Sequence, residues 1–218
     1  MRWIRWAIII VLGALLGLWM GFKGVEWNAA TLILIFVSVF VILAVPAIVR
    51  TNYMLRYSRN MSSVESCLKK LSRTIPYYAA MNDLLDGQVE SAANRMGNIK
   101  NDKLRAVVGA NVAIAGERWQ EAEQHINQQK HTDVKHVGRA IIRLMQDDWN
   151  GFEGAKRLVE HPGLVHALEA DAAFRRGDLA KAEQHGELAI EKTAGLQRYA
   201  LIRYRELSSK QPNRKSYF

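Results

Sequence analysis

The residues best suited to metal binding or acid–base chemistry in this sequence are its histidines. The chain has six of them, and four form two pairs with a spacing of five residues: His131 with His136, and His161 with His166. Two ligands on one helix face are expected three or four residues apart, so neither pair predicts a metal site. His125 and His185 each end a copy of the tetrapeptide AEQH, which favours a structural role. We expect no metal.

Other catalytic and cofactor-binding patterns are missing from the sequence. It contains no GxxxxGK[ST] loop, no GxGxxG after a predicted strand and no GxSxG elbow. Asp147 and Asp148 precede a predicted turn, which favours a role at a helix end over catalysis. Cys67 is the single cysteine, so an internal disulfide, a zinc ribbon and a C-x-x-C site are excluded. We expect no enzyme activity and no cofactor.

Two uncharged stretches near the amino terminus predict that the chain is anchored in a membrane. Residues 6–22 contain no charged side chain, and neither do residues 27–49. A helix of about 20 apolar residues crosses the hydrocarbon core of a bilayer, and both stretches are long enough. The intervening residues 23–26 form only a short loop, so the sequence predicts a transmembrane hairpin with spans at about 4–22 and 27–49. No A-x-A-like site follows the first stretch, which argues against a cleaved signal peptide.

The distribution of basic residues predicts the orientation of this hairpin. Arg2 and Arg5 precede the first span, six basic residues lie in 50–73, and the connecting loop has only Lys23. Because positive residues stay on the cytoplasmic side, both termini are expected in the cytoplasm, with the chain in the cell membrane. Cys67 lies near this membrane side, where a structural role and palmitoylation are both open.

Three glycines in the first span form a GxxxGxxxG series, Gly13, Gly17 and Gly21. Small residues at this spacing let membrane helices approach closely. The series therefore predicts either a contact between chains or packing of the two spans within the hairpin. The short loop favours packing within the hairpin.

The net charge of +9 is unevenly distributed. Residues 50–73 carry six basic residues against one acidic residue, and residues 198–218 have the same balance, whereas 74–197 carry 15 basic and 18 acidic residues. A basic segment beside a membrane is attracted to anionic lipids, so 50–73 is expected to contact lipid or to set the topology. The acidic middle and the lack of a reader motif argue against nucleic-acid binding.

Residues 74–208 read as pairs of amphipathic helices. Apolar residues recur at three- and four-residue spacing, and turn residues interrupt the pattern. First helices are expected near 75–85, 103–115, 135–147 and 164–176, second helices near 88–97, 117–129, 151–160 and 178–192, and a last helix at 196–208. Small residues mark the turns and second helices at roughly regular intervals: Gly87, Ala92, Gly116, Ala122, Ala155, Gly177 and Ala182. A repeated helix pair of this length indicates an α-solenoid.

The motif GDLAKA at 177–182, followed by Ala189 and Ile190, resembles the turn and second helix of a tetratricopeptide repeat. Gly109, with Val108 and Val112, resembles the first helix of that family, where a small residue lets the two helices approach. The layout of two spans followed by helical repeats is similar to HemY-type membrane proteins. The third unit has no turn glycine, and the units are shorter than the period typical of the family.

We therefore expect an all-α protein: a transmembrane hairpin (1–49), a basic juxtamembrane segment (50–73), a repeat domain resembling tetratricopeptide repeats (74–208) with a capping last helix, and a basic tail (209–218). The resemblance implies a scaffold that recruits partner proteins to the membrane. The alternative is an accessory subunit of a membrane enzyme or transport complex, held through its spans. Four polar residues of the first helices are candidate partner contacts: Asn111, Arg143, Asp171 and Arg175.

Overall fold

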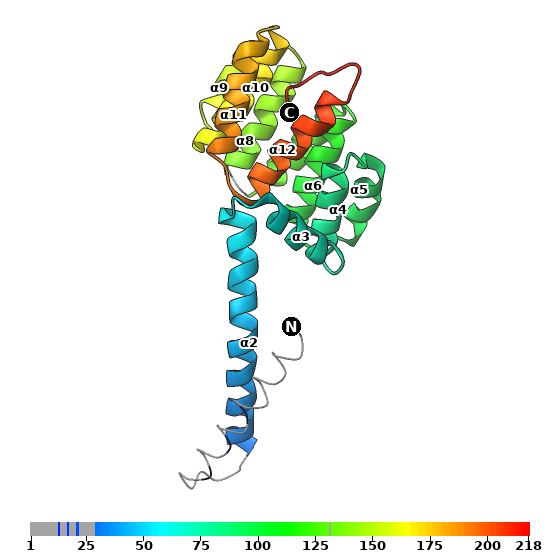
Figure 1. The fold of residues 1–218 in the computed structure, drawn as a ribbon. Coiled ribbons are helices and arrows are strands. Elements are labelled where there is room, and N and C mark those ends of the chain that lie inside the picture. Colours follow the sequence, from blue (N-terminus) through cyan, green and yellow to red (C-terminus); the bar gives the residue numbers. More distant parts are fainter. Residues whose placement is uncertain (1–12, 14–16, 18–20, 22–28, 131) are drawn as a thin grey trace. The chain divides into compact units, whose positions relative to one another are not determined.

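The computed structural model describes residues 13, 17, 21, 29–130 and 132–218 (Figure 1). All regular secondary structure in these residues is helical, which confirms the all-α prediction. The chain divides into two compact units, residues 1–49 and 50–218. The predicted first span lies outside the described residues except for Gly13, Gly17 and Gly21, which are helical.

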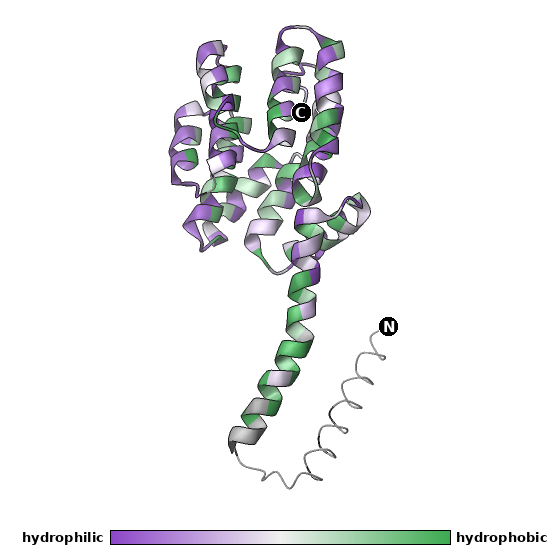
Figure 2. Ribbon diagram, turned by 90° about the vertical axis from the view of Figure 1, so that its left-hand side faces the viewer, coloured by the Kyte–Doolittle hydropathy of each residue, from purple (hydrophilic) through white to green (hydrophobic). Residues whose placement is uncertain are grey.

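Helix α2 covers Ala29–Tyr57 and contains Pro46 without ending there. Within the described residues, one helical segment, Ile35–Tyr57, is long and apolar enough to cross a membrane. Apolar side chains such as Phe36 and Phe40 are exposed, and Figure 2 shows the hydrophobic colour along most of the helix. The described part of the chain does not cover this apolar surface, as expected for a helix that contacts lipid. The helix continues to Tyr57, beyond the predicted end of the second span at residue 49.

The remaining helices belong to residues 50–218. Asn60 caps α3 (Met61–Ser72) by accepting a hydrogen bond from the backbone N–H of Ser63. Eight helices then follow as four hairpins. The first two are α4 (Pro76–Leu85) with α5 (Val89–Arg95), and α6 (Asp102–Ala115) with α7 (Trp119–Gln128); the 3-10 turn η1 (Met96–Asn98) continues α5. The last two are α8 (Thr132–Met145) with α9 (Trp149–Lys156), and α10 (Pro162–Arg175) with α11 (Leu179–Glu191). These ranges confirm the predicted order of helices.

The turns inside the four hairpins share one backbone geometry. Each contains a residue with positive φ, and the four are equally spaced along the sequence: Gly87 (76°), Glu117 (55°), Asp147 (57°) and Gly177 (79°). The N–H of the next residue bonds a carbonyl five residues back, as in the bond from Gln88 to Asp83 at 2.8 Å. This is the hydrogen bond of a Schellman motif, and it recurs in all four turns. The helix pairs therefore repeat with one constant period, which includes the third pair.

With this constant period, two residues of the predicted repeat signature, Ala155 and Gly116, are not at the equivalent positions. Fully buried residues occupy one equivalent position in each second helix: Ala92, Ala122, Phe152 and Ala182. Phe152 takes the place predicted for Ala155, which is half-buried one turn later and packs against the cluster that contains Phe152. In the second turn, Glu117 has the left-handed conformation, and Gly116 is the C-cap of α6 at φ −91°. Gly109 is buried, and a Cβ there would lie 2.7 Å from the His125 ring, so α6 and α7 approach closely.

The last helix, α12 (Gly195–Ser209), packs against other helices besides α11, the helix before it. It contacts α11, and it also contacts α3 and α4 from the start of the unit. Tyr199 lies in a cluster with Val64, Leu68 and Leu85, whereas Leu201 packs with Ala167, Ala189 and Ile190 on the last hairpin. The helix predicted as a one-sided cap therefore joins the two ends of the helical array.

The start of α12 is fixed by Gly195, whose φ is 56°. Its backbone N–H donates to the Ser58 carbonyl at 2.8 Å. A Cβ at Gly195 would lie 2.1 Å from the Leu55 carbonyl oxygen. Only glycine satisfies both this conformation and this contact. The chain just after α2 and the start of α12 are thus held together.

Candidate protein-interaction site

The four predicted partner contacts do not gather at one place. Asp171 and Arg175 lie one turn apart on α10, and Asn111 donates from its side chain to the Val107 carbonyl of its own helix at 2.8 Å. Arg143 pairs with Glu123 of α7 at 2.9 Å and lines a separate cavity. Of the four, Asp171 has the contacts expected of a peptide-binding residue.

The Asp171 carboxylate is buried and bound by the backbone of a distant segment of the same chain. Its Oδ1 accepts the backbone N–H of Tyr217 at 2.8 Å and of Phe218 at 3.0 Å. Burial raises the pKa of Asp171 from 3.8 to about 6, against the opposing effect of these two hydrogen bonds and of Arg214 and Arg175. One oxygen thus holds two successive main-chain amides, so the backbone is turned at Tyr217 and Phe218, because an extended strand points successive N–H groups to opposite sides.

A pocket of small residues receives the Tyr217 side chain. Tyr217 is 8% exposed and packs against Ala170, Ala173 and Ala182. Gly186 of α11 forms the floor, because a Cβ there would lie 2.3 Å from Tyr217 Cε1. Phe218 packs beside the pocket against the cluster that contains Ile190 and Leu201. The alanines and the glycine of α10 and α11 create the space for the ring.

Basic residues complete the contact. The Arg214 guanidinium lies 4.5 Å from the Phe174 ring centroid and 4.9 Å from that of Tyr217. Lys215 forms an ion pair with Glu117 in the turn between α6 and α7. Figure 1 shows the chain turning back after α12 to reach this position. We call residues 211–218 the tail segment and its contact surface, around Asp171, Gly186, Phe174 and Glu117, the tail site.

Arg175 has a structural partner outside the tail site. Its guanidinium bonds Asp147, the residue with positive φ in the third turn, at 2.5 Å. Asp148 caps α9 by accepting the Gly151 N–H at 2.9 Å, which confirms the helix-end role predicted for it. Arg175 therefore joins α10 to the preceding hairpin.

The Arg143 cavity lies among α7, α8 and α9 and has a volume of about 370 Å³. Its polar lining includes Arg139, whose guanidinium donates to Asn127 at 2.7 Å, and His136. Glu123 neutralises Arg143, so the lining mixes charges of both signs. This arrangement favours no single ligand.

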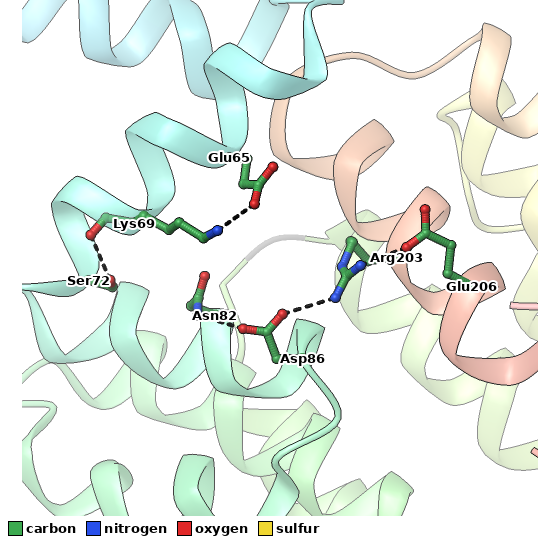
Figure 3. Close-up of polar contacts among 7 residues, drawn as sticks. All are labelled: Glu65, Lys69, Ser72, Asn82, Asp86, Arg203 and Glu206. Atoms are coloured by element: carbon green, nitrogen blue, oxygen red, sulfur yellow. Dashed lines mark hydrogen bonds and ion pairs between the residues drawn. The ribbon is translucent and has the colours of Figure 1, made fainter. Parts of the chain in front are cut away.

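A third polar cluster fastens α12 to the first helices (Figure 3). Arg203 bonds Asp86, the C-cap of α4, at 3.0 Å, and Glu206 of its own helix at 2.6 Å. Lys69 pairs with Glu65 on α3, and Asn82 donates to Asp86 at 2.9 Å. These residues hold the fold together, and their charges are paired within the cluster.

The structure brings together two histidines whose sequence spacing gave no such indication. His166 Nδ1 and His185 Nδ1 lie 3.1 Å apart, with Lys192 Nζ 3.2 Å from His166 Nε2. His161 instead caps α10 by accepting the Gly163 N–H. The described part of the chain contains no group of three or more histidine, cysteine or acidic side chains placed to hold a metal ion.

Cys67 is half-buried on α3, where burial raises the pKa of its thiol. A raised thiol pKa reduces the reactive thiolate at neutral pH. At the three span glycines, an added Cβ would meet no described atom within 4 Å. The contact that these glycines make stays a prediction.

The tail segment forms the buried contact that sequence reasoning missed. Its net basic charge suggested a solvated end. The adjacent aromatic residues Tyr217 and Phe218 in an otherwise polar stretch were the signal for a buried contact. No protein-family model, curated protein or solved structure matches the chain.

Proposed function

We propose that this chain is a two-pass membrane protein whose helix pairs form a solenoid resembling tetratricopeptide repeats and recruit a partner protein at the cytoplasmic face of the cell membrane. The proposal assigns the chain to binding and not to catalysis. The apolar α2 and the basic residues on either side of the two uncharged stretches support the topology. The equal spacing of the hairpin turns supports the repeat architecture.

One observation carries the assignment to binding: buried Asp171 accepts two successive main-chain amides of a segment that follows the last helix. An unpaired buried carboxylate would be costly, so the site is stable only when donors are supplied. A bound peptide supplies them from its backbone, and side-chain pockets then add selectivity. Helical hairpins that present such a site are suited to holding a segment of another protein.

Basic residues in α2 and α3 suit this domain to a membrane surface. Arg50, Arg56 and Arg59 precede α3, and Lys70 and Arg73 lie at its carboxyl end. Each basic residue near an anionic lipid surface contributes about 1 kcal/mol. We therefore include anionic lipids among the partners and exclude nucleic acid.

Photo-crosslinking in native membranes tests this function. A photoreactive residue is placed at Glu187, whose side chain is 61% exposed beside the tail site. We expect a defined partner to be captured there, and the capture to be lost in Asp171→Ala, which removes the acceptor. The matched control position is Glu90, an exposed residue of α5.

Two outcomes would contradict the proposal. One is capture of the same proteins from Glu187 and Glu90, which would indicate proximity without a site. The other is capture from Glu187 that Asp171→Ala leaves unchanged while circular dichroism shows an intact helical domain.

The membrane topology is tested separately, with single cysteines introduced into Cys67→Ser. Glu26→Cys in the predicted outer loop should react with an impermeant maleimide in intact cells, whereas Lys210→Cys, at the end of α12, should react only after permeabilisation. Labelling of Lys210→Cys in intact cells would place the helical domain outside and refute the cytoplasmic orientation. Release of the intact chain from salt-washed vesicles would exclude membrane spans.

A further inference from the structure

The contacts of the tail segment define which chemistry the tail site accepts. We infer that the tail site binds, in place of residues 214–218, a segment of a partner protein in which a basic residue precedes two adjacent aromatic residues. The tail segment is then an intramolecular competitor of that partner. This inference rests on the proposed function and adds the class of ligand.

The backbone requirement comes from Asp171. Its Oδ1 accepts the N–H groups of both Tyr217 and Phe218. A proline at either position has no N–H to donate, so such segments are excluded. The two bonds do not depend on side-chain identity and set only the position and direction of the backbone.

The aromatic requirement comes from α10, α11 and α12. The Tyr217 ring rests on Gly186, where any side chain would occupy its place. The Phe218 ring packs at 5.1 Å and 84° to Tyr217, against the cluster of Ile190 and Leu201. Two neighbouring rings therefore have separate apolar positions, and edge-to-face packing stabilises them against each other.

The basic requirement comes from charge and ring contacts. Glu117 pairs with Lys215, and Asp171 places a second carboxylate at the site. The Phe174 ring faces the Arg214 guanidinium, a cation–π contact that an acidic segment would not form. Segments with acidic residues before the aromatic pair are thus disfavoured.

The tail segment is attached in a way that permits exchange. Residues 211–213 are exposed, and Tyr217 is the one buried residue of the tail segment, all of which the structure describes. Arg214 donates to the Ser216 and Tyr217 carbonyls within the segment, whereas Ser208 of α12 donates to the Ser216 carbonyl at 2.6 Å and accepts a hydrogen bond from Arg214 at 2.8 Å. A chain with few buried side chains and exposed neighbours opens locally at low free energy.

A labelled peptide with the sequence of residues 210–218 tests the inference on the detergent-solubilised chain. The receptor variant ends after Lys210, which removes the competitor and leaves α12 complete. We expect saturable binding to this variant, weaker binding by about tenfold or more to the intact chain, and a similar loss in the variant that also carries Asp171→Ala. A peptide with proline in place of Tyr217 is the matched control.

A second receptor guards against misfolding of the truncated chain. The full-length Tyr217→Ser variant vacates the pocket without truncation, and it should bind the same peptide. If either folded receptor fails to bind, or if the proline peptide binds equally well, the inference is overturned. Tyr217-dependent dimerisation of the intact chain would make a second copy the occupant and would also overturn it.

The outcome of the peptide-binding experiment is independent of the outcome of the crosslinking test. Peptide binding without a captured partner would leave the ligand chemistry supported and refute recruitment in membranes. A captured partner without peptide binding would support recruitment and refute the basic–aromatic ligand.

Discussion

Replacing Gly186 with alanine should detach the tail segment from the helical domain. The added Cβ would lie 2.3 Å from Cε1, 2.7 Å from Cζ and 2.9 Å from the hydroxyl oxygen of Tyr217. The pocket walls are Ala170, Ala173 and Ala182, whose short side chains cannot move aside. The ring must therefore leave its position on α11.

The magnitude follows from what the ring and the backbone lose. Burial of a large apolar side chain is worth about 1.5–3 kcal/mol. Hydrogen bonds to a charged group contribute about 1.5–3 kcal/mol each, and Tyr217 and Phe218 donate two of them to Asp171. Alanine inside a helix is favoured over glycine by about 1 kcal/mol, so α11 itself gains. The result is local release with little change in global stability.

Hydrogen exchange and limited trypsin digestion measure this release. We expect the Tyr217 and Phe218 amides to exchange at least about tenfold faster, corresponding to about 1.4 kcal/mol, and cleavage after Arg214 and Lys215 to accelerate similarly. Gly154→Ala is the control, because a Cβ there meets nothing within 4 Å. Equal protection of the tail amides in both variants would refute the assignment of Gly186 as the pocket floor.

Four further results are expected. The pKa of Asp171 is about 6 in the folded chain, compared with its ordinary value of 3.8. The folded chain therefore binds more protons than the unfolded chain between these values, and its unfolding free energy falls by up to about 3 kcal/mol from pH 4 to pH 7. Denaturant titrations should show that Asp171→Asn removes this fall. Arg203→Ala should loosen α12 from α4 and lower the unfolding free energy by about 1 kcal/mol. An unchanged unfolding free energy would show that the Arg203–Asp86 ion pair does not stabilise the fold. Gly195→Ala should cost more than about 2 kcal/mol through its φ and the Leu55 clash, measured by thermal unfolding. Gly17→Leu should leave partner capture at the tail site intact; its loss would favour the accessory-subunit alternative.

The order and approximate ends of the helices were predictable because local signals determine them. The helix expected at 103–115 is Asp102–Ala115, where Asn101 caps the first turn. The helix expected at 151–160 is Trp149–Lys156, because Asp148 caps it two residues earlier and the chain turns after Arg157. Apolar spacing fixes the face of a helix well and its ends less well.

The exact period of the repeat was harder to predict than the order of the helices, although the sequence contained a signal for it. The two copies of AEQH begin at Ala122 and Ala182, and the position midway between them is residue 152. A large phenylalanine stands there, so a search for small residues selected Ala155. Burial, not residue size, is what the equivalent positions share: Phe152, Ala122 and Ala182 are all 0% exposed.

The tail site could not be predicted from local patterns. Asp171 was chosen as a polar residue on a first helix, and its partners lie 46 and 47 residues further along the chain. Nothing in the spacing of Asp171 distinguishes it from Asn111, which occupies the equivalent repeat position two helix pairs earlier. The difference arises from the return of the chain after α12, which depends on the packing of that helix.

That packing also explains how a binding site and a stable fold can coexist in one short domain. α12 is fixed at its start by Gly195 and along its length by Arg203, Tyr199 and Leu201, none of which belongs to the tail segment. Removing residues 211–218 leaves the contacts of α12 with the helices in place and removes the two backbone donors of Asp171. The helix that closes the array therefore holds the tail segment close to its site, at a high effective concentration. Under the proposed function, a partner segment must exceed this local advantage, so recruitment would require either tighter contacts than the tail segment makes or a partner concentrated at the same membrane.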